Sequence, residues 1–263
     1  MIITSPVISV VMPSYNSEKF ITNSIDSVIK QTFTSWELLI IDGGSNDNTI
    51  NIVKSYLNNH QNIKLISNLH DQGPAHARSI GLKKGIGDYF AFIDADDTWL
   101  EDKLSKQHNF MKNNSYYFSY TSYKRLSKDG QISKSKIPIH SSNTYTQYLG
   151  RRGIANSTVM IHKKCIVEDI FNSISSYHGE DTLWWLIIMR EGYNSYLLDE
   201  PLSIYRDVEG SLSSKFVKHQ LGVWHLYRKS LNLNLYKAML YYFLYLSDVF
   251  VRRVKFKIAS FLN

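Results

Sequence analysis

The stretch Phe90-Ala91-Phe92-Ile93-Asp94-Ala95-Asp96-Asp97-Thr98-Trp99 decides the fold that we expect for this chain. An apolar run of the type found in buried strands ends in three carboxylates within four residues. Crowded carboxylates repel one another, so the cluster indicates a shared counter-ion. Mg²⁺ or Mn²⁺ is the natural candidate, because one or two carboxylates and substrate phosphates usually hold it. Alternatively, Asp96, Asp97 or Thr98 caps a helix that runs through Leu104.

Apolar segments of strand type alternate with helical patterns through the first hundred residues. The expected strands are residues 8–13, 36–42, 63–66 and the segment entering Asp94, and the expected helices are residues 20–29, 48–57 and 73–84. This β-α-β-α-β-α-β order predicts an α/β fold, with a mostly parallel sheet flanked by helices.

Polar side chains follow three of these strands at their carboxyl ends. Tyr15 and Asn16 follow the first strand, Asp42 ends the second, and the three clustered carboxylates follow the fourth. The carboxyl ends of parallel strands meet at one edge of a sheet, where nucleotides bind in such folds. We therefore expect these residues to share one pocket.

The second half of the chain is less regular. We expect helices at residues 99–111 and 183–189, strands at 116–125, 157–161, 196–198 and 202–206, and two helical segments from residue 215 that change over near 232–234. The single cysteine, Cys165, excludes a disulfide framework, and the N-terminus lacks a signal-peptide pattern. Both features favour a cytoplasmic protein.

The positive charge of the chain lies in its tail. Residues 215–263 carry nine Lys or Arg and one acid, Asp248, which gives this tail a charge of +8 and leaves −1 of the total +7 for residues 1–214. The apolar run at residues 238–247 is too short to span a bilayer. Its basic and aromatic flanks are typical of a helix lying on anionic lipid. The alternatives are a helix pair packed on the body and a dimer contact.

A nucleoside diphosphate ligand would use the predicted edge as follows. Asp42 can accept a hydrogen bond from the N–H of a uracil-type base, Asp96 can hold ribose hydroxyls, and Asp97 can bind the metal. Asp94 would lie near both, and Arg78 can reach the same pocket from the helix before this strand. As alternatives, Asp42 organises a turn and Arg78 is a solvated helix residue.

A second pair of carboxylates, Glu180-Asp181, precedes a strongly apolar helix. A sugar transfer by direct displacement needs a general base for the acceptor hydroxyl, and either residue can supply it. The alternative is a helix N-terminus enriched in acids. Trp184 and Trp185 in this helix are expected in the core.

These motifs together resemble family 2 glycosyltransferases of the GT-A fold. The segments that carry the resemblance are residues 10–16, 27–33, 40–49, 73–81, Asp94-Ala95-Asp96-Asp97 and Glu180-Asp181. The family commonly has a second Asp where this chain has Gly43, so only Asp42 is carried over. The resemblance is specific over residues 7–105 and weak beyond residue 206.

The resemblance implies the roles of several residues. Pro13, Tyr15 and Asn16 would lie beside the nucleotide, and Arg206 would contact phosphate in the segment that closes over the donor, with Ser211-Leu212-Ser213 beyond it. The Asp-x-Asp motif would place Asp96 near the ribose, and on the metal together with Asp97. Asp181 would be the usual base of the Glu-Asp pair.

The resemblance also implies an activity and an organisation. The expected activity is inverting transfer from a nucleotide sugar, most simply UDP-glucose or UDP-galactose, with Mg²⁺ or Mn²⁺, as in enzymes of bacterial O-antigen and capsule synthesis. The acceptor would be a polyprenyl-diphosphate-linked saccharide at the cytoplasmic face of the inner membrane. Residues 1–214 would form the catalytic domain, with a nucleotide-sugar half at 1–105 and an acceptor half at 106–214, and residues 215–263 a basic amphipathic helical tail.

Two other classes of protein share some of these features. A nucleic-acid- or membrane-binding module with a non-catalytic nucleotide fold would explain the basic tail, but the carboxylate-rich edge would repel phosphate without a metal. A nucleotidyltransferase needs a glycine-rich, basic loop after the first strand, and Pro13-Ser14-Tyr15-Asn16 has neither feature.

Overall fold

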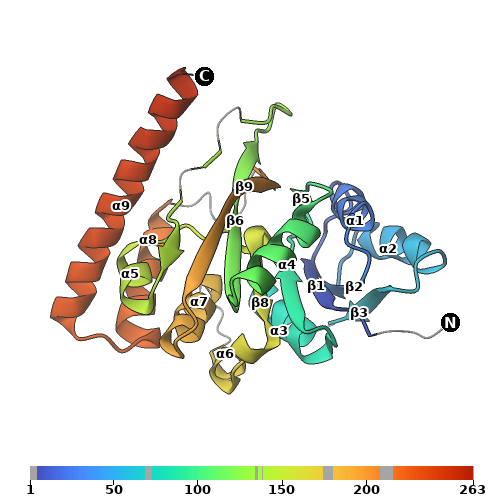
Figure 1. Ribbon diagram of the computed structural model, residues 1–263, viewed down its shortest axis with the longest axis horizontal. Coiled ribbons are helices and arrows are strands. Elements are labelled where there is room, and N and C mark those ends of the chain that lie inside the picture. The colour runs from blue at the N-terminus through green and yellow to red at the C-terminus, as the bar shows by residue number, and fades with distance from the viewer. Residues whose placement is uncertain are drawn as a thin grey trace.

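The computed structural model describes residues 5–68, 73–133, 136–137, 139–173, 180–207 and 216–262. Its centre is a mixed sheet with the strand order β3-β2-β1-β4-β8-β6-β9-β5, and β7 pairs with β9 (Figure 1). Helices cover both faces of the sheet, and the long helix α9 lies at the edge of the molecule farthest from β3.

The first half of the chain forms the predicted alternation. Its elements are β1 (Ile8–Ser14), α1 (Ile21–Ile29), β2 (Trp36–Asp42), α2 (Thr49–Leu57), β3 (Ile63–Ser67), α3 (Pro74–Lys84) and β4 (Tyr89–Phe92). The strands β3, β2, β1 and β4 are parallel neighbours. The β-α-β prediction is therefore confirmed for this half, and the carboxyl ends of β1, β2 and β4 lie at one edge.

The second half extends the sheet through an antiparallel strand, β8, which lies between β4 and β6. The strands are β5 (Thr98–Trp99), β6 (Phe118–Leu126), β7 (Ser142–Asn143), β8 (Val159–His162) and β9 (Ser195–Arg206). The helices are α4 (Lys103–Asn113), α5 (Tyr145–Gly150), α6 (Glu168–Asn172), α7 (Glu180–Arg190), α8 (Phe216–His225) and α9 (Leu235–Leu262), with short 3₁₀-helices η1 (Asn156–Thr158) and η2 (Lys163–Cys165) and a π-helical turn η4 (Leu226–Ser230).

Several elements of the second half differ from the sequence prediction, and two of these differences follow from strand pairing. The helix expected from residue 99 begins at Lys103, because Trp99 pairs with Ser203 of β9 and donates its indole N–H to the Ser157 carbonyl at 2.7 Å. The two strands expected at 196–198 and 202–206 are one strand, β9, whose pairing with β6 shifts register on either side of Ser122. Tertiary pairing overrides local propensity at both places.

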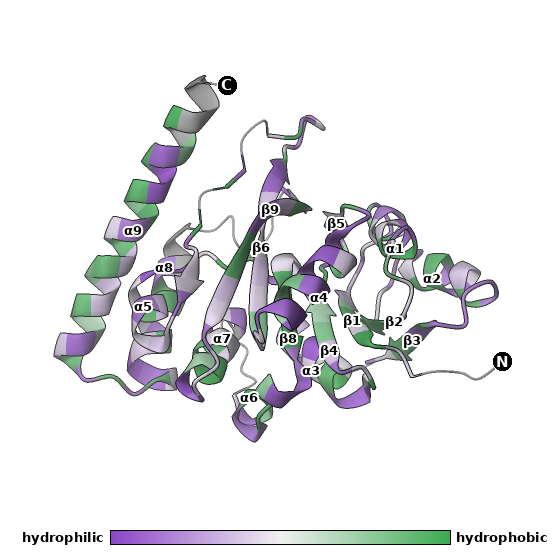
Figure 2. Cartoon of the chain, viewed as in Figure 1, coloured by the Kyte–Doolittle hydropathy of each residue, from purple (hydrophilic) through white to green (hydrophobic). Residues whose placement is uncertain are grey.

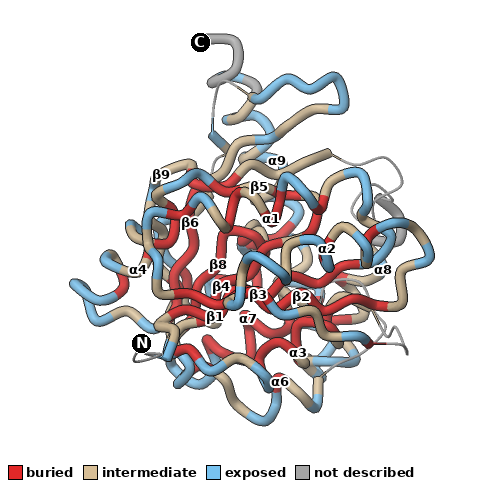
Figure 3. The backbone as a smooth tube through the Cα atoms, turned by 90° about the vertical axis from the view of Figure 1, so that its right-hand side faces the viewer, coloured by how far each residue is buried: buried red, intermediate tan, exposed pale blue. Residues whose placement is uncertain are grey.

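The sheet separates two hydrophobic cores, because successive strand residues point to opposite faces. Alternate residues of β1, β2 and β4 pack with α1, α2 and α4 on one side, and with α3, α5 and α7 on the other. Figure 3 shows the central strands buried between these layers. Trp184 and Trp185 are buried in the second core, which confirms the prediction that they lie in the core, and Cys165 is buried there too.

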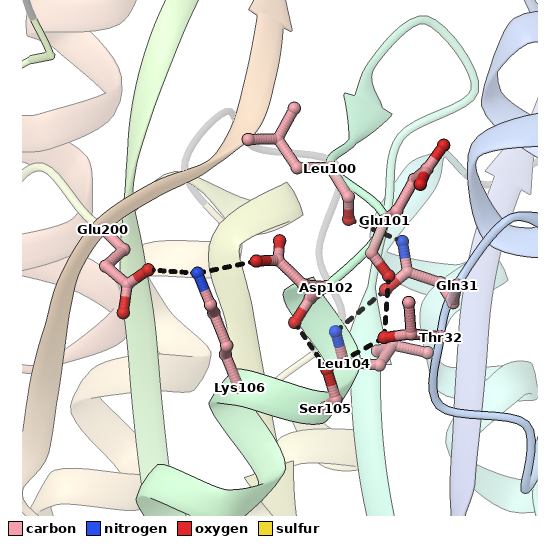
Figure 4. Close-up of polar contacts among 9 residues, drawn as sticks. All are labelled: Gln31, Thr32, Leu100, Glu101, Asp102, Leu104, Ser105, Lys106 and Glu200. Atoms are coloured by element: carbon pink, nitrogen blue, oxygen red, sulfur yellow. Dashed lines mark hydrogen bonds and ion pairs between the residues drawn. The ribbon is translucent and has the colours of Figure 1, made fainter.

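The connection after β5 is fixed between α1 and β9 (Figure 4). The Gln31 side chain donates to the Leu100 carbonyl at 2.7 Å and accepts from the Leu104 N–H at 2.9 Å. Lys106 of α4 lies 2.6 Å from both Asp102 and Glu200 of β9. These contacts hold the segment that follows the three carboxylates in one position.

The C-terminal helices change over where the sequence predicted, between the turn η4 and the start of α9. Tyr227, Ala238 and Tyr245 belong to the second core, so this part of the tail packs on the body. Figure 2 shows hydrophobic and hydrophilic residues alternating along α9. Over the ranges that the structure describes, no helix combines the length and apolar content needed to cross a bilayer.

We expect Gly87→Ala to lower the free energy of unfolding by about 1–3 kcal/mol, as overpacked core sites do. A Cβ at Gly87 would lie 2.7 Å from the Ser9 backbone nitrogen in β1, and that central strand cannot move without disturbing its two parallel neighbours. The matched control is Ile86→Ala, at an exposed side chain in the same turn, which should stay within about 0.5 kcal/mol of wild type. Chemical denaturation measures both values; equal stabilities would contradict the close approach.

Candidate active site

The turn after β1 contacts the turn after β2 at the carboxyl edge of the sheet. Asn16 has a positive φ of 46°, which Asn tolerates better than most residues. Its side-chain oxygen accepts from the Asn46 N–H at 2.8 Å, and its own N–H donates to Ser45 Oγ at 2.9 Å. Tyr15 is exposed, whereas Pro13 is buried within β1. Of the three predicted nucleotide contacts, Tyr15 and Asn16 are thus exposed at the carboxyl edge of the sheet, and Pro13 is not.

Asp42 is buried, and its carboxylate organises the turn that follows β2. One oxygen accepts from the hydroxyls of Ser14 and Ser45, at 3.0 and 2.6 Å. The other accepts from the N–H groups of Gly44 and Ser45, at 3.0 and 2.9 Å. This is the turn geometry that the sequence left open as the alternative. The base contact of Asp42 stays a prediction.

Arg78 of α3 is buried and forms an ion pair with Asp94, with 2.6 Å between Nη2 and Oδ1. The interpretation of Arg78 as a solvated helix residue was therefore wrong. Asn156 of η1 also donates to Asp94 Oδ1, at 3.3 Å. The contacts bring α3, the end of β4 and η1 to one point, beside the two further carboxylates.

Asp97 is the most deeply buried of the three clustered carboxylates, with 1% of its surface exposed. Oδ2 accepts from Ser157 Oγ at 2.5 Å, and Oδ1 accepts from the Arg206 backbone N–H at 2.9 Å. Asp96 is only partly buried, and its carboxylate has no bond to another residue that the structure describes. Neither residue caps a helix, since α4 begins at Lys103; the capping alternative was wrong.

Burial and mutual repulsion shift the acidities of this cluster. Burial, and then the charge of Asp94, raise the pKa of Asp96 to about 6. The pKa of Asp97 is also raised well above its ordinary value, by burial first and then by Asp94 and Asp96. The raised pKa values mean that the ionised forms of these acids are destabilised, and a bound cation would stabilise them.

Arg206, at the end of β9, forms hydrogen bonds to both Asp96 and Asp97. Besides its backbone bond to Asp97, its Nε donates to the Asp96 carbonyl at 2.9 Å, and the guanidinium lies 5.0 Å from the centre of the Phe20 ring. The sequence predicted only a phosphate contact here, and it did not single out Ser157. Ser211-Leu212-Ser213 lie outside the described residues.

Asp181 lies in the first turn of α7 and is half-buried. Its Oδ1 accepts from the Thr182 N–H at 2.7 Å, while Oδ2 makes no bond within the described part of the chain. Burial, and then the charge of Asp181, raise the pKa of Tyr148, which lies in α5, a helix that packs against α7. The α7 backbone begins at Glu180, whose side chain lies outside the described residues.

The residues present fit a hard divalent cation. Across the described ranges, no group of three or more His, Cys, Asp or Glu side chains is placed to hold a metal ion. Mg²⁺ or Mn²⁺ is usually held by only one or two carboxylates, with substrate phosphates and water completing its shell. The Asp96 carboxylate has no hydrogen bond to another residue that the structure describes, whereas each oxygen of Asp97 accepts one hydrogen bond. Metal binding by Asp96 and Asp97 stays a prediction.

Comparison with known proteins identifies the family. Residues 9–170 match the family model described as Glycosyl transferase family 2. The chain belongs to this family. It is also 34% identical to the UDP-Glc:alpha-D-GlcNAc-diphosphoundecaprenol beta-1,3-glucosyltransferase WfgD of Escherichia coli, over 82% of this chain and 83% of that protein.

Solved structures of glycosyltransferases confirm the GT-A fold. S. aureus TarS 1-349 in complex with UDP-GlcNAc matches with a TM-score of 0.64 at 21% identity, over 84% of this chain and 66% of that one. The mannosyltransferase PcManGT from Pyrobaculum calidifontis, in complex with GDP-Man and Mn²⁺, matches with 0.67 at 15% identity, over 88% and 65%. This chain spans 43% of a longer TarS structure, so the likeness concerns the shared fold.

We expect Asp97→Asn to gain stability relative to wild type as the pH rises from 5 to 8 in EDTA. An acid whose pKa is raised by folding stabilises the fold below its unfolded value, and this contribution is lost as the pH rises through the folded value. The asparagine has no proton to lose; its amide oxygen can accept from the Arg206 N–H, and its amide N–H can donate to Ser157 Oγ. The difference in unfolding free energy should grow by at most about 1.4 kcal/mol per pH unit.

The control for this measurement is Asp88→Asn. Lys163 lowers the pKa of Asp88, so this contribution has the opposite sign: wild type gains stability over the variant as the pH rises through the acid range. Urea titrations at several pH values measure both variants. A pH-independent difference for Asp97→Asn would contradict the raised pKa.

Proposed function

We propose that this protein transfers one sugar from a nucleotide sugar, UDP-glucose or UDP-galactose, to a hydroxyl of a polyprenyl-diphosphate-linked saccharide, with inversion at the anomeric carbon. The observation that carries the proposal is the braced acidic cluster at the carboxyl edge of a GT-A sheet, with Asp181 on the neighbouring helix α7. The glucosyltransferase WfgD, whose name specifies UDP-Glc and an undecaprenyl-diphosphate acceptor, supports the donor and acceptor classes and favours UDP-glucose.

The donor would lie across the ends of β1, β2 and β4. Asp42 and the turn at Tyr15-Asn16 would hold the nucleoside, and Asp96 would hold the cation with Asp94 beside it. When bound, Mg²⁺ or Mn²⁺ neutralises the charge that develops on the departing diphosphate. Arg78 already neutralises Asp94 at 2.6 Å, and Arg206 is placed to meet a phosphate oxygen.

The reaction is a single displacement. The acceptor oxygen forms a bond to the anomeric carbon while the bond from that carbon to the diphosphate oxygen breaks, and UDP leaves with the bonding electrons. The hydroxyl proton passes to Asp181, whose Oδ2 has no internal donor in the described structure. The buried Trp184 and Trp185 hold α7 against the sheet and thereby fix the direction from which Asp181 approaches.

We expect Asp96→Asn to abolish Mn²⁺-dependent hydrolysis of UDP-glucose, and Asp181→Asn to lower kcat for transfer about 10²–10⁴-fold with an unchanged donor KM. Assays with a panel of UDP-, GDP- and dTDP-sugars and a GlcNAc-diphospho-lipid analogue measure both quantities. The control is Asp169→Asn, a surface acid paired with Arg190 away from the site, which should leave both rates unchanged. If wild type neither binds nor cleaves any sugar nucleotide with either metal, the proposal fails.

We further propose that the protein works peripherally on the cytoplasmic face of the inner membrane, through an outward-facing stripe on α9. The stripe consists of the exposed apolar residues Tyr236, Met239, Leu240, Phe243, Phe250, Val254 and Ile258. These residues lie on one face of the helix at three- and four-residue spacing, except between Phe243 and Phe250, where Ser247 occupies the intervening position.

The charges around the stripe complement anionic lipid. The one acid of the tail, Asp248, is turned inward, where it lies 2.7 Å from His140 and accepts from Arg252 at 2.8 Å. The outward side keeps exposed basic residues such as Arg253 and Lys255. A second copy of this helix would bring like charges together, whereas an anionic bilayer attracts them.

We expect Phe243→Glu/Phe250→Glu to reduce co-sedimentation with phosphatidylglycerol vesicles more than tenfold, since burying each phenylalanine contributes about 1.5–3 kcal/mol. Both side chains are exposed, so the fold should survive, whereas deleting the tail would remove Tyr227 and Tyr245 from the core. Leu221→Glu, at an equally exposed position on α8, is the control. Equal binding of wild type and the double variant would refute the stripe as a membrane contact.

A further inference from the structure

Arg152 is a buried cation with unused hydrogen-bonding capacity. Only 8% of its surface is exposed, and the guanidinium lies 4.8 and 5.0 Å from the ring centres of Tyr227 and Tyr245. It forms no ion pair with an acid that the structure describes, and its buried Nε and Nη2 have no hydrogen-bond acceptor there. Buried polar groups are rarely left unsatisfied, so these N–H groups indicate a missing partner with acceptor oxygens.

A narrow cleft lies beside Arg152. His140, Asn143, Tyr148 and Arg151 line it together with Arg152, and its interior has room for about one water molecule. Among the described residues that line this cleft, none is a carboxylate, and Arg151 is exposed at its rim. A phosphate oxygen is about the size of a water molecule, so one such oxygen can enter while the remainder of the anion stays at the rim.

The cleft lies between the donor site and α9. Arg152 precedes Asn156, a neighbour of Asp94, by four residues, which span at most about 14 Å when extended. Tyr148 of α5 lines the cleft together with Arg152, and α5 packs against α7, whose first turn carries Asp181.

The segment 150–153, which contains Arg151 and Arg152, packs against α9, the helix of the proposed membrane contact. A Cβ at Gly150 would lie 3.0 Å from the Cβ of Leu244, and one at Gly153 would lie 2.5 Å from Nη1 of Arg252. Arg252 lies on the inward side of α9, so the loop adjoins this helix from the side of the body. A lipid-linked acceptor in the membrane beside α9 would bring its diphosphate near this loop, with its sugar toward Asp181.

We propose that Arg151 and Arg152 form a subsite for the diphosphate of the lipid-linked acceptor. The inference rests on the proposed function, because only that acceptor class carries a diphosphate between sugar and lipid. One phosphate oxygen occupies the water-sized space and accepts from Arg152, while Arg151 pairs with the diphosphate at the rim. Guanidinium groups suit this task, since their forked N–H groups match phosphate oxygens.

Calorimetry with inorganic pyrophosphate in EDTA tests the subsite without metal, donor or acceptor. Wild type should bind pyrophosphate, and Arg151→Gln and Arg152→Lys should each weaken binding at least tenfold. Arg152→Lys keeps the charge between the two tyrosines, so the fold should survive; thermal unfolding verifies this. Arg190→Gln removes a surface arginine elsewhere and should bind as wild type does. If wild type does not bind pyrophosphate, or both loop variants bind it equally well, a trapped water explains Arg152 and the proposal is overturned.

Two further measurements separate the subsite from other roles. With a GlcNAc-diphospho-lipid acceptor, Arg151→Gln should raise the acceptor KM at least tenfold, while hydrolysis of the donor and KM for a GlcNAc alkyl glycoside stay unchanged. Equal losses with both acceptors would show a structural role instead. Binding to phosphatidylglycerol vesicles should be unaffected by Arg151→Gln and weakened by Arg253→Gln; the reverse result would assign the loop to lipid headgroups. Absence of donor hydrolysis in wild type refutes the proposed function but leaves the pyrophosphate result to decide the subsite.

Discussion

The carboxylate of Asp97 is bonded from two distant parts of the chain, and the site takes its shape from these bonds. Ser157 Oγ and the Arg206 N–H occupy its two oxygens, so η1 and the end of β9 are tied to the turn after β4. A buried carboxylate without donors would be costly, so this turn, η1 and β9 must close together. With Asp97 fixed, Asp96 is held partly exposed at the carboxyl edge of the sheet.

The same arrangement concentrates negative charge that the protein itself only partly neutralises. Arg78 pairs with Asp94, yet the pKa of Asp96 is still raised to about 6. Burial and mutual repulsion thus destabilise the ionised acids, and a bound cation would offset this cost, which is a common compromise between stability and function. The basic groups of the acceptor side, Arg151 and Arg152, lie apart from this cluster and would meet a different phosphate group.

The sequence was sufficient for the first half of the fold because each strand and helix there is marked by its own periodicity. Local pattern failed where a distant partner decides the structure. The sequence around Trp99 predicts a helix, but Trp99 pairs with Ser203. The sequence of β9 predicts two short strands, but pairing with β6 makes them one. Asp42 and Arg78 were placed at the correct edge. The hydrogen bonds to Asp97 could not be predicted from the local sequence, because the donors Ser157 and Arg206 are 60 and 109 residues away.

This separation along the chain has a consequence for synthesis. A nascent chain that ends before β9 already contains all four strands of the parallel half and the three acids of the cluster, but lacks the backbone donor at Arg206. Contacts between distant segments form late, because closing a long loop has an entropic cost. The parallel half can therefore assemble during translation, whereas the finished pocket must await the last strand of the sheet. A ribosome-bound fragment is thus a nucleotide fold without a competent donor site.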